Sequence, residues 1–410
     1  MSKLVHFFYQ NTKKGGVDTF LINLINNWPK KKTKFNIYVN KSHPGIGNLK
    51  KKIKRNFKII NYNFLLSQDL DKSNSFLLKS LIIKKIIRLM LLIKIVFLKN
   101  KDIENIIKSI GINSNFYIIN GGYQGGEACI KANLIWAKTN PMNYCFHVFH
   151  NNASKDKSLV HFLENFLRNK IDYYLSNSKT KFITVSKSCA ISMKNRKNFL
   201  NKKIEVIYNG VEKTSVKRNR NLNLRNKFKL KKNSKIILML SVLESRKGFD
   251  FILRVCKIIF KYNHNLFLFI FGYGTTEEKI KITNLIKSYG LKRRVFLQNF
   301  YLNTEEIYKQ SNVTVIPSQF NESFGYVAVE SFLNKIPVVA TKVGGLKEII
   351  KHEFNGYIVS KSNYKKFGYY ILKSLNRKKN IKLINYAYKD AKQKFNPLKM
   401  SKLYRNLVKK

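Results

Sequence analysis

The second half of the chain alternates short apolar runs with longer segments of helical periodicity. The apolar runs predict strands at Ile236–Val242, Leu266–Phe271, Val295–Leu297, Val313–Pro317 and Pro337–Thr341. The periodic segments between them predict helices at Phe249–Phe260, Glu277–Tyr289, Thr304–Gln310 and Phe324–Leu333. Continuous apolar strands that alternate with helices are typical of a parallel sheet covered on both faces. The second half is therefore predicted to be a doubly wound α/β domain.

The first half shows a weaker version of the same pattern. Its predicted strands are Leu4–Tyr9, Phe35–Val39, Phe57–Ile60, Tyr117–Ile119, Tyr144–Phe149 and Phe182–Val185. We therefore predict an N-terminal Rossmann-like domain over 1–205 and a second one over 206–380. A basic helical tail over 381–410 follows, for which a return to the N-terminal domain is one option. Two such domains would place a ligand cleft between them, at the carboxyl ends of the strands.

The composition fits a folded chain with an extreme charge. Of 410 residues, 79 are Lys or Arg and 22 are Asp or Glu, which gives a formal net charge of +57. A hydrophobic fraction of 44% excludes disorder for most of the chain. The four cysteines lie far apart in sequence, so they form no CxxC motif, and a reducing compartment is the simplest interpretation.

The charge has two interpretations, a solvated lysine-rich surface or a polyanionic partner such as a membrane surface or nucleic acid. The first half is the more basic one, since no Asp or Glu occurs from Thr19 to Gln68. The most apolar stretch, Phe76–Leu98, is interrupted by Lys and Arg, and its longest uncharged run is Leu89–Ile93. A spanning helix needs about 20 apolar residues. The stretch instead predicts a basic helix that lies on a membrane or packs on its own domain.

Two glutamates in the second half carry the clearest chemistry. Glu322 follows a predicted strand, and Glu330 lies eight residues further along the next helix, about 12 Å away along the axis. The backbone N–H groups of Phe324, Gly325 and Tyr326 are expected to start that helix and could bind an anion. Gly325 leaves room for a phosphate. A sugar joined to a diphosphate would fit the two glutamates and the helix N-terminus between them. The alternative interpretation is an ordinary helix with a charged first turn and one exposed glutamate.

This stretch resembles the Glu-x7-Glu motif of the family 4 retaining glycosyltransferases, which have the GT-B fold of two Rossmann-like domains facing across a cleft. The resemblance covers nearly the whole chain and is strongest over Ile204–Val359. It implies that Glu330 holds the ribose hydroxyls of the nucleotide. It also implies that Glu322 contacts the donor sugar and stabilises developing positive charge. The Pro-Val-Val-Ala-Thr strand and the Gly-Gly-x-x-Glu segment ending at Glu348 are similar to parts of the family's nucleotide pocket.

The segment Ser-Val-Leu-Glu-Ser-Arg-Lys-Gly, which ends at Gly248, resembles the family's Gly-Arg-Leu-x-x-x-Lys-Gly loop. In the family, the Arg and Lys of this loop neutralise the donor diphosphate. Lys247 matches the Lys, but Val242 stands at the Arg position, and the adjacent Arg246 is the candidate substitute. Without the resemblance, Lys247 would be interpreted as a surface lysine at a helix start.

Three further motifs agree with the resemblance. Gly272-Tyr-Gly274 resembles the Gly-x-Gly turn beside the nucleotide base, although a strand-ending turn is the common explanation. Gly15 and Gly16 precede a helix and resemble the loop that brings backbone amides to the donor phosphate and the acceptor. His150, at the end of a predicted strand, would face the donor sugar, and a core or rim histidine is the alternative.

The resemblance implies neither a catalytic metal nor a cofactor, since the donor, a UDP- or GDP-sugar, is a substrate. Asp69-Leu-Asp71 matches the Asp-x-Asp metal signature of the other large glycosyltransferase fold. It lies in a polar stretch away from any strong strand end, and we interpret it as a chance match.

The implied function is retaining transfer of a hexose from a nucleotide-diphosphate sugar to a hydroxyl of a glycan or lipid-linked acceptor. This activity suits bacterial surface polysaccharide or lipopolysaccharide synthesis. The expected location is the cytoplasm, peripherally at the inner face of the cytoplasmic membrane. The anionic surface of that membrane is the expected partner. Three alternatives stay open: an inactive glycosyltransferase-like protein, a GT-B enzyme with other chemistry such as an epimerase, and a basic nucleic-acid-binding protein. The last has no RRM, KH or helix-turn-helix signature, so no nucleic-acid partner is expected.

Overall fold

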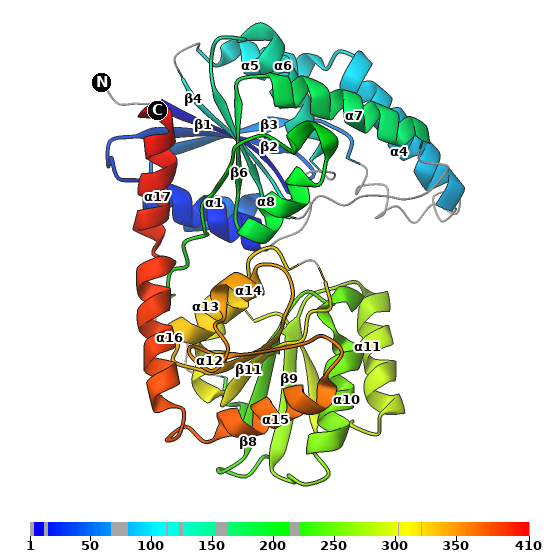
Figure 1. The fold of residues 1–410 in the computed structure, drawn as a ribbon, viewed down its shortest axis with the longest axis vertical. Coiled ribbons are helices and arrows are strands. Elements are labelled where there is room, and N and C mark those ends of the chain that lie inside the picture. The colour runs from blue at the N-terminus through cyan, green and yellow to red at the C-terminus, as the bar shows by residue number, and fades with distance from the viewer. Residues whose placement is uncertain are drawn as a thin grey trace. The chain divides into compact units, whose positions relative to one another are not determined.

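The computed structural model forms two compact units that are described here one at a time (Figure 1). The structure describes residues 4–11, 15–66, 81–111, 114–122, 126–151, 162–213, 222–301, 303–320 and 322–409. Unit 1 comprises residues 1–210 together with 397–410, and unit 2 comprises residues 211–396. The tail predicted as 381–410 is therefore divided between the units at Pro397, where a residue without a backbone N–H begins a new helix.

Unit 1 is built on seven parallel strands in the order β3-β2-β1-β4-β5-β6-β7. The strands are β1 (Leu4–Gln10), β2 (Lys34–Asn40), β3 (Phe57–Tyr62), β4 (Asn115–Asn120), β5 (Cys145–Phe149), β6 (Thr180–Thr184) and β7 (Ile204–Val206). Its helices are α1 (Gly16–Asn26), α2 (Ile46–Lys52), α4 (Leu81–Phe97), α5 (Lys101–Ser109), α6 (Glu127–Thr139), α7 (Phe162–Asn177), α8 (Lys187–Lys194) and α17 (Pro397–Asn406). The described part of unit 1 also contains 3₁₀ turns at Lys197–Phe199 and Leu407–Lys409.

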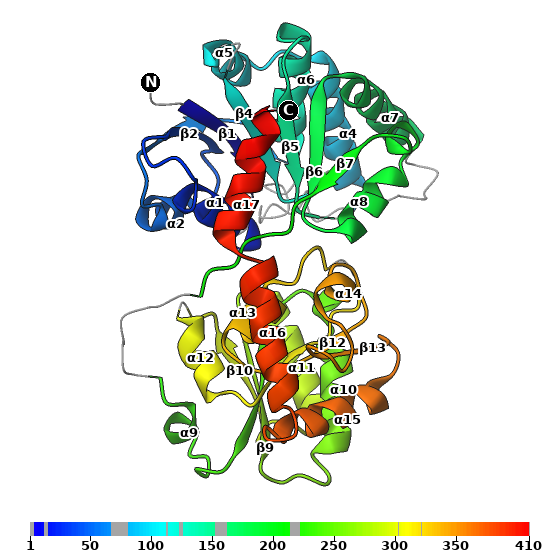
Figure 2. The same ribbon diagram turned by 60° about the vertical axis from the view of Figure 1, so that its left-hand side comes forward.

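Helices cover both faces of the unit 1 sheet (Figure 2). Because successive strand residues point to opposite faces, Phe8 enters the core beneath α4, α5, α6 and α7. Its neighbour Phe7 packs against Trp28, Phe35 and Tyr117. On that second face the Tyr117 hydroxyl donates to the carbonyl of Tyr404 at 2.8 Å, which fastens α17 to the sheet.

Unit 2 is built on six parallel strands in the order β10-β9-β8-β11-β12-β13. The strands are β8 (Lys235–Leu240), β9 (Leu266–Gly272), β10 (Val295–Asn299), β11 (Val313–Ile316), β12 (Val338–Thr341) and β13 (Tyr357–Val359). Its helices are α9 (Leu224–Lys227), α10 (Phe249–Ile259), α11 (Thr276–Ser288), α12 (Thr304–Gln310), α13 (Tyr326–Leu333), α14 (Leu346–Ile349), α15 (Tyr364–Leu375) and α16 (Ile381–Lys394), with a 3₁₀ turn at Ser245–Lys247. One core lies beneath α10, α11 and α15, and the other beneath α9 and α12.

The prediction of two doubly wound parallel domains is confirmed. In each sheet the first strand lies inside the sheet, and the chain winds first to one side and then to the other. The direction reverses between β1 and β4 in unit 1 and between β8 and β11 in unit 2. Ligands bind at such switch points, outside the carboxyl ends of the strands.

Candidate functional site

The loops after β8 and β11 meet at the switch point of unit 2. Lys247 lies in the loop after β8 and Glu322 in the loop after β11, and the Lys247 Nζ to Glu322 Oε2 distance is 2.7 Å. Both side chains are only 14% exposed. The hydroxyl of Ser318 donates to the same carboxylate oxygen at 2.8 Å. The fold thus brings two predicted site residues into one partly buried ion pair.

Glu322 is held in its charged form. Burial acts to raise the pKa of this carboxyl, but the charge of Lys247 and the hydrogen bonds from Lys247 and Ser318 outweigh it. The net result is a pKa below the ordinary value. At neutral pH the site therefore carries a carboxylate against an ammonium in a partly water-excluded position, where electrostatic effects are strong.

Two glycines fix the backbone of Glu322. The N–H of Gly345 donates to the Glu322 carbonyl at 2.7 Å. At Gly344, φ is +48°, and a Cβ there would lie 2.0 Å from the same carbonyl oxygen. The Gly-Gly pair is required because the loop after β12 passes so close to the backbone around Glu322 that neither position 344 nor position 345 has room for a Cβ atom.

Gly344→Ala is expected to destabilise unit 2 by about 3 kcal/mol, because a left-handed φ and a backbone clash are combined. Gly290→Ala is the matched control, since Gly290 has φ +70° but no atom within 4 Å of its added Cβ. The control should lose only about 1 kcal/mol. The measurement is thermal unfolding by circular dichroism, with tryptophan fluorescence as the reporter of unit 1, which holds Trp28 and Trp136. Equal losses in the two variants would contradict the close approach.

The loop that carries Lys247 is fixed in a similar way. At Gly248, φ is +78°, and a Cβ would lie 2.0 Å from the Pro317 carbonyl oxygen. The N–H of Gln319 donates to the Arg246 carbonyl at 2.8 Å. Backbone contacts between the two loops therefore fix the position of Lys247 independently of its side chain.

Arg246, the candidate substitute for the missing family arginine, is a partly exposed member of the same site. Its Nε lies 2.6 Å from a Glu244 carboxylate oxygen, and the two side chains are 28% and 26% exposed. The charge of Arg246 contributes to the low pKa of Glu322, but less than Lys247 does. Arg246 is thus close enough to influence the site, while its guanidinium is bonded to Glu244.

Glu330 lies on α13 and is anchored by a tyrosine that the sequence did not single out. The hydroxyl of Tyr308, on α12, donates to Glu330 Oε2 at 3.1 Å. Tyr308 is buried, and burial, followed by the charge and hydrogen bond of Glu330, raises its pKa well above the ordinary value. Nothing in the helical pattern distinguishes this tyrosine from an ordinary core residue.

The start of α13 gives Gly325 and Phe324 structural roles. Gly325 has φ +116°, and a Cβ there would lie 2.8 Å from a methyl group of Leu346. The side chain of Phe324 is 3% exposed, with its ring 5.5 Å from that of Phe395. The glycine therefore accommodates an internal contact, and only the backbone of Phe324 could meet a ligand.

Gly272 and Gly274 also serve a close internal contact. A Cβ on Gly272 would lie 2.1 Å from the Ser241 carbonyl oxygen, and one on Gly274 would lie 2.7 Å from Cβ of Leu243. The two glycines let the end of β9 pack against the loop after β8. They position the loop of Lys247, whether or not a base binds beside them.

In unit 1, a buried polar network lies beneath Gly15 and Gly16. Asp18 in the first turn of α1 accepts the Gly15 N–H at 3.2 Å and the hydroxyl of Tyr9. His43 Nε2 lies 3.0 Å from Asp18, and its Nδ1 lies 2.8 Å from the Asn11 carbonyl oxygen. Sequence reasoning missed this network, although an acidic residue at the third position of a helix is the spacing of a capping box.

His150 follows β5 in unit 1 and is 7% exposed. Its Nδ1 donates to the Asn120 carbonyl at 3.1 Å, since a carbonyl can only accept. Burial lowers its pKa to about 3, against a smaller opposing effect of that hydrogen bond. Its Nε2 is therefore an unprotonated acceptor, and it has no hydrogen-bond partner within the described part of the chain. Asp69 and Asp71 lie outside the described residues.

Known proteins share both the sequence pattern and the fold. Residues 221–390 match the family model of glycosyl transferases group 1. An uncharacterized glycosyltransferase of Methanocaldococcus jannaschii is 33% identical over 217 residues, which cover 51% of this chain and 52% of the relative. The O-antigen biosynthesis glycosyltransferase WclY of Escherichia coli is 28% identical over 141 residues, 34% of this chain and 38% of the relative. The chain thus spans about half the length of the first relative and less of the second.

The crystal structure of Anabaena HepE in complex with UDP and glucose matches the whole chain. The TM-score is 0.74 at 15% identity, and the match covers 100% of both chains. The two parallel sheets of seven and six strands, together with this match, show that the fold is GT-B.

Proposed function

We propose that this chain, whose residues 221–390 match the family model of glycosyl transferases group 1, is a retaining glycosyltransferase of the family 4 type. It would move a hexose from a nucleotide-diphosphate sugar to a hydroxyl acceptor. The observation that carries the proposal is the partly buried Lys247–Glu322 ion pair at the switch point of unit 2, eight residues before Glu330.

The donor would meet charged side chains of unit 2 in order along its length. Glu330 would accept hydrogen bonds from the ribose hydroxyls, and Lys247, with Arg246 beside it, would neutralise the diphosphate. Glu322 would contact the sugar. The solved relative with UDP and glucose bound supports a uridine nucleotide as the first donor to test.

In the proposed step, the bond from the anomeric carbon to the leaving diphosphate breaks while the acceptor oxygen approaches from the same face. The proton of the acceptor hydroxyl passes to a departing phosphate oxygen. Glu322 stabilises the positive charge that develops on the sugar, and Lys247 stabilises the negative charge on the diphosphate. Such catalysis rests on positioning and preorganised charge, so it needs no metal for charge neutralisation. The buried Nε2 of His150 would accept a hydrogen bond from a sugar hydroxyl.

The acceptor would be a glycan or a lipid-linked glycan in surface polysaccharide synthesis. The named relative in O-antigen biosynthesis supports this class of product. A net charge of +57 supports the proposal that the enzyme acts at an anionic membrane surface, the inner face of the cytoplasmic membrane.

Titration calorimetry with UDP, GDP and ADP tests the nucleotide site. We expect saturable binding of one nucleotide, weakened at least about tenfold by Glu330→Ala, because a carboxylate that accepts from two ribose hydroxyls is lost. Glu353→Ala is the control, since this glutamate is half-exposed and pairs with Lys373 elsewhere in unit 2.

The titration also separates the proposal from its rival. Val242 at the family arginine position and the bonding of Arg246 to Glu244 favour an inactive glycosyltransferase-like protein as the second candidate. Nucleotide binding without turnover on any sugar donor would support that candidate. Failure of the folded protein to bind any nucleotide would contradict the proposal and favour the inactive or the nucleic-acid-binding alternative.

A further inference from the structure

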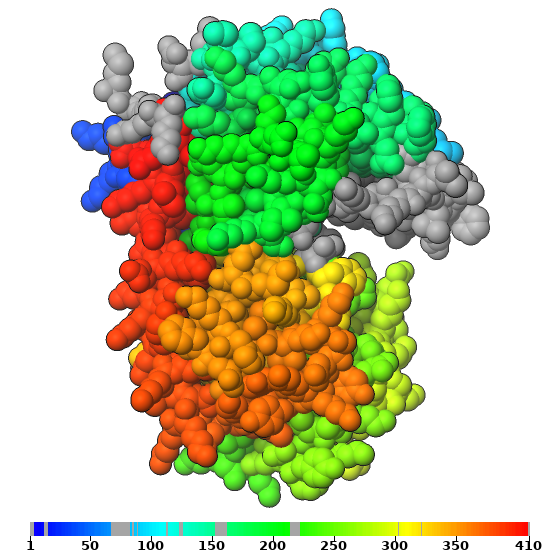
Figure 3. All heavy atoms as spheres, in the orientation of Figure 1, coloured from blue at the N-terminus to red at the C-terminus, as the bar shows by residue number. Residues whose placement is uncertain are grey.

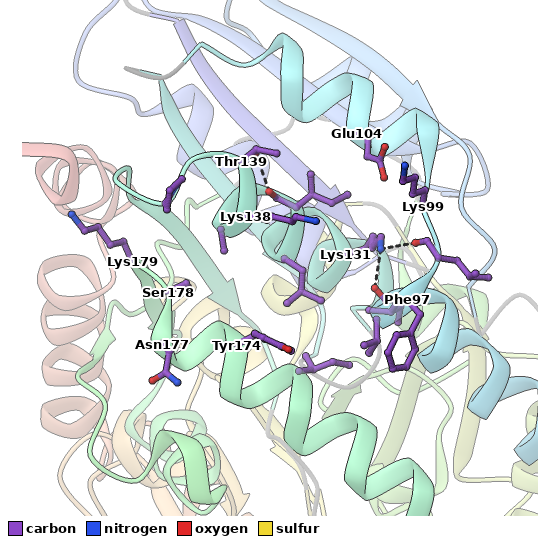
Figure 4. Close-up of a pocket in the computed structure, with 18 of the residues that line it drawn as sticks. Phe97, Lys99, Glu104, Lys131, Lys138, Thr139, Tyr174, Asn177, Ser178 and Lys179 are labelled. Atoms are coloured by element: carbon purple, nitrogen blue, oxygen red, sulfur yellow. Dashed lines mark hydrogen bonds between the residues drawn. The ribbon is translucent and has the colours of Figure 1, made fainter.

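A groove of about 980 Å³ lies in unit 1 among α4, α5, α6 and α7 (Figure 4). Two residues of its lining lie just before strands in the sequence. Pro141 comes shortly before β5, and Lys179 comes immediately before β6. The groove is therefore at the amino edge of the parallel sheet, whereas Gly15 and His150 follow the carboxyl ends of their strands. It is separate from the site described above.

The lining of the groove is apolar and its border is basic. Ile95, Phe97, Leu98, Leu134, Ile135 and Tyr174 contribute apolar surface. Four exposed lysines surround it, namely Lys99, Lys108, Lys138 and Lys179, and Glu104 is the one acidic side chain among the described residues of the lining. An apolar floor with a cationic border fits a molecule that has a hydrocarbon part and an anionic head.

A buried cation lies inside the groove. Lys131 is 7% exposed, and its Nζ donates to the carbonyls of Ile95 and Leu98 at 2.9 and 2.7 Å (Figure 4). An ammonium has three donors. The third makes no hydrogen bond within the described residues, where the charge of Glu104 acts on Lys131 from the same lining. A charged donor at this depth favours an anionic acceptor.

The groove continues into an exposed apolar surface. On α4, Ile86, Met90, Ile93 and Phe97 recur at the spacing of one helix face and are 47%, 60%, 37% and 58% exposed. On α7, Phe162, Phe166 and Tyr173 form a second such stripe, at 80%, 55% and 57%. The Lys170 ammonium lies 5.0 Å from the Phe97 ring and links the two stripes. The space-filling view shows α7, in green, at the surface of unit 1 (Figure 3).

We propose that this α4–α7 surface docks unit 1 on an anionic phospholipid bilayer, with one lipid held in the groove. The exposed side chains of both stripes would enter the headgroup region. The phosphate of the bound lipid would meet Lys131 and the border lysines, and an acyl chain would lie along Leu134 and Ile135. Within the described ranges, every helix is too short or too polar to span a bilayer. The contact is thus one of helices lying on the surface.

The charges select a bilayer over a second copy of the chain. A copy seated on this surface would bring the same lysines against the same lysines, and like charges in contact are unfavourable. An anionic bilayer attracts each lysine near its surface by about 1 kcal/mol. Exposed apolar stripes that are flanked by lysines and include few acidic residues match that partner.

The docking rests on the membrane partner named in the proposed function. Vesicle flotation tests it without reference to sugar transfer, so failure of docking and failure of the transferase activity are distinguishable. The full chain is mixed with vesicles of phosphatidylcholine alone or with phosphatidylglycerol added. We expect recovery with the anionic vesicles, and a drop of at least tenfold in affinity for Lys99→Glu/Lys138→Glu. The control is Lys231→Glu/Lys232→Glu in unit 2, which changes net charge equally at exposed positions. Equal losses in both double variants would overturn the proposal in favour of diffuse charge.

A tryptophan probe tests insertion directly. Phe97→Trp is expected to shift its emission to the blue and to be quenched by lipids that carry a quencher in the acyl region. Tyr262→Trp, at a position 82% exposed in unit 2, should not respond. The native tryptophans are buried and form a constant background. Absence of quenching in Phe97→Trp would overturn the proposal. So would a protein that does not bind vesicles but forms a dimer that Met90→Ser disrupts.

Discussion

Glu322→Gln is expected to lower turnover by about two to three orders of magnitude, the usual effect of removing one group that stabilises charge in a transition state. The side-chain size and a hydrogen-bond acceptor for Ser318 are kept. Only the negative charge beside the sugar is lost. Lys247, now without its carboxylate partner at 2.7 Å, becomes more available to the diphosphate. Donor affinity should therefore stay the same or increase while kcat falls.

Steady-state kinetics with the donor identified by calorimetry separates these two parameters. A fall in kcat with unchanged KM is the signature of a group that acts only in the transition state, and a lower KM beside it would reflect tighter binding of the donor by the released Lys247. Glu353→Gln is the matched control at an exposed ion pair of unit 2. A variant in which only KM rises would show that Glu322 merely binds the donor, and unchanged kinetics would remove Glu322 from the site.

The sequence predicts the sheet of unit 2 well because its strands are continuous apolar runs. The expected strand at Ile236–Val242 is β8 (Lys235–Leu240), and the expected helix at Phe249–Phe260 is α10 (Phe249–Ile259). Neither β7 nor β13 is predicted, and each is a three-residue strand at the edge of its sheet. No helix is predicted at α7, because its four aromatic side chains are all exposed and its apolar residues therefore do not mark a single buried face.

Part of the candidate site is readable from sequence, since Glu322 and Glu330 lie close together along the chain. Their partners are not readable, because they depend on tertiary packing. Ser318 and Tyr308 appear as ordinary loop and core residues until the fold places them against these carboxylates. Likewise, Asp18 and His43 are separated by α1 and β2 in sequence and meet only in the folded unit.

Lys335, two residues before Pro337, adopts a backbone conformation that usually favours glycine. In the structure Lys335 has φ +57°, the left-handed region that glycine enters without strain. The Nζ of Lys335 lies 5.1 Å from the centre of the Tyr388 ring, which offsets part of that strain.

Lys247→Met is the second substitution with a large expected effect, and it should lower both turnover and the stability of unit 2. Turnover should fall by about two to three orders of magnitude, because the charge on the leaving diphosphate is no longer neutralised. At pH 7 the unfolding free energy of unit 2 should fall by about 3 kcal/mol, because a partly buried carboxylate is left without its partner. Tryptophan fluorescence, which reports on unit 1, should show an unchanged transition.

The pH dependence of the stability loss identifies its cause. In the wild type Lys247 keeps the pKa of Glu322 below its unfolded value, so the pair stabilises the protein above that unfolded value, about 4.3. This stabilisation is lost as the pH falls through the lower folded pKa. In Lys247→Met, burial acts without the lysine and raises the pKa of Glu322. The difference in stability between the two proteins should therefore be large at pH 7 and shrink below about pH 4.

The double variant Lys247→Met/Glu322→Gln separates the structural role of the pair from its chemical role. A neutral amide beside the introduced thioether no longer requires a cation, so most of the lost stability should return, as happens when both partners of a buried pair are neutralised. Activity should not return, since both charges that act on the donor are absent. Circular dichroism melts at pH 7 and kinetics on the three variants make the comparison. A double variant as unstable as Lys247→Met alone would show that packing of the lysine stem, rather than the unpaired carboxylate, causes the loss.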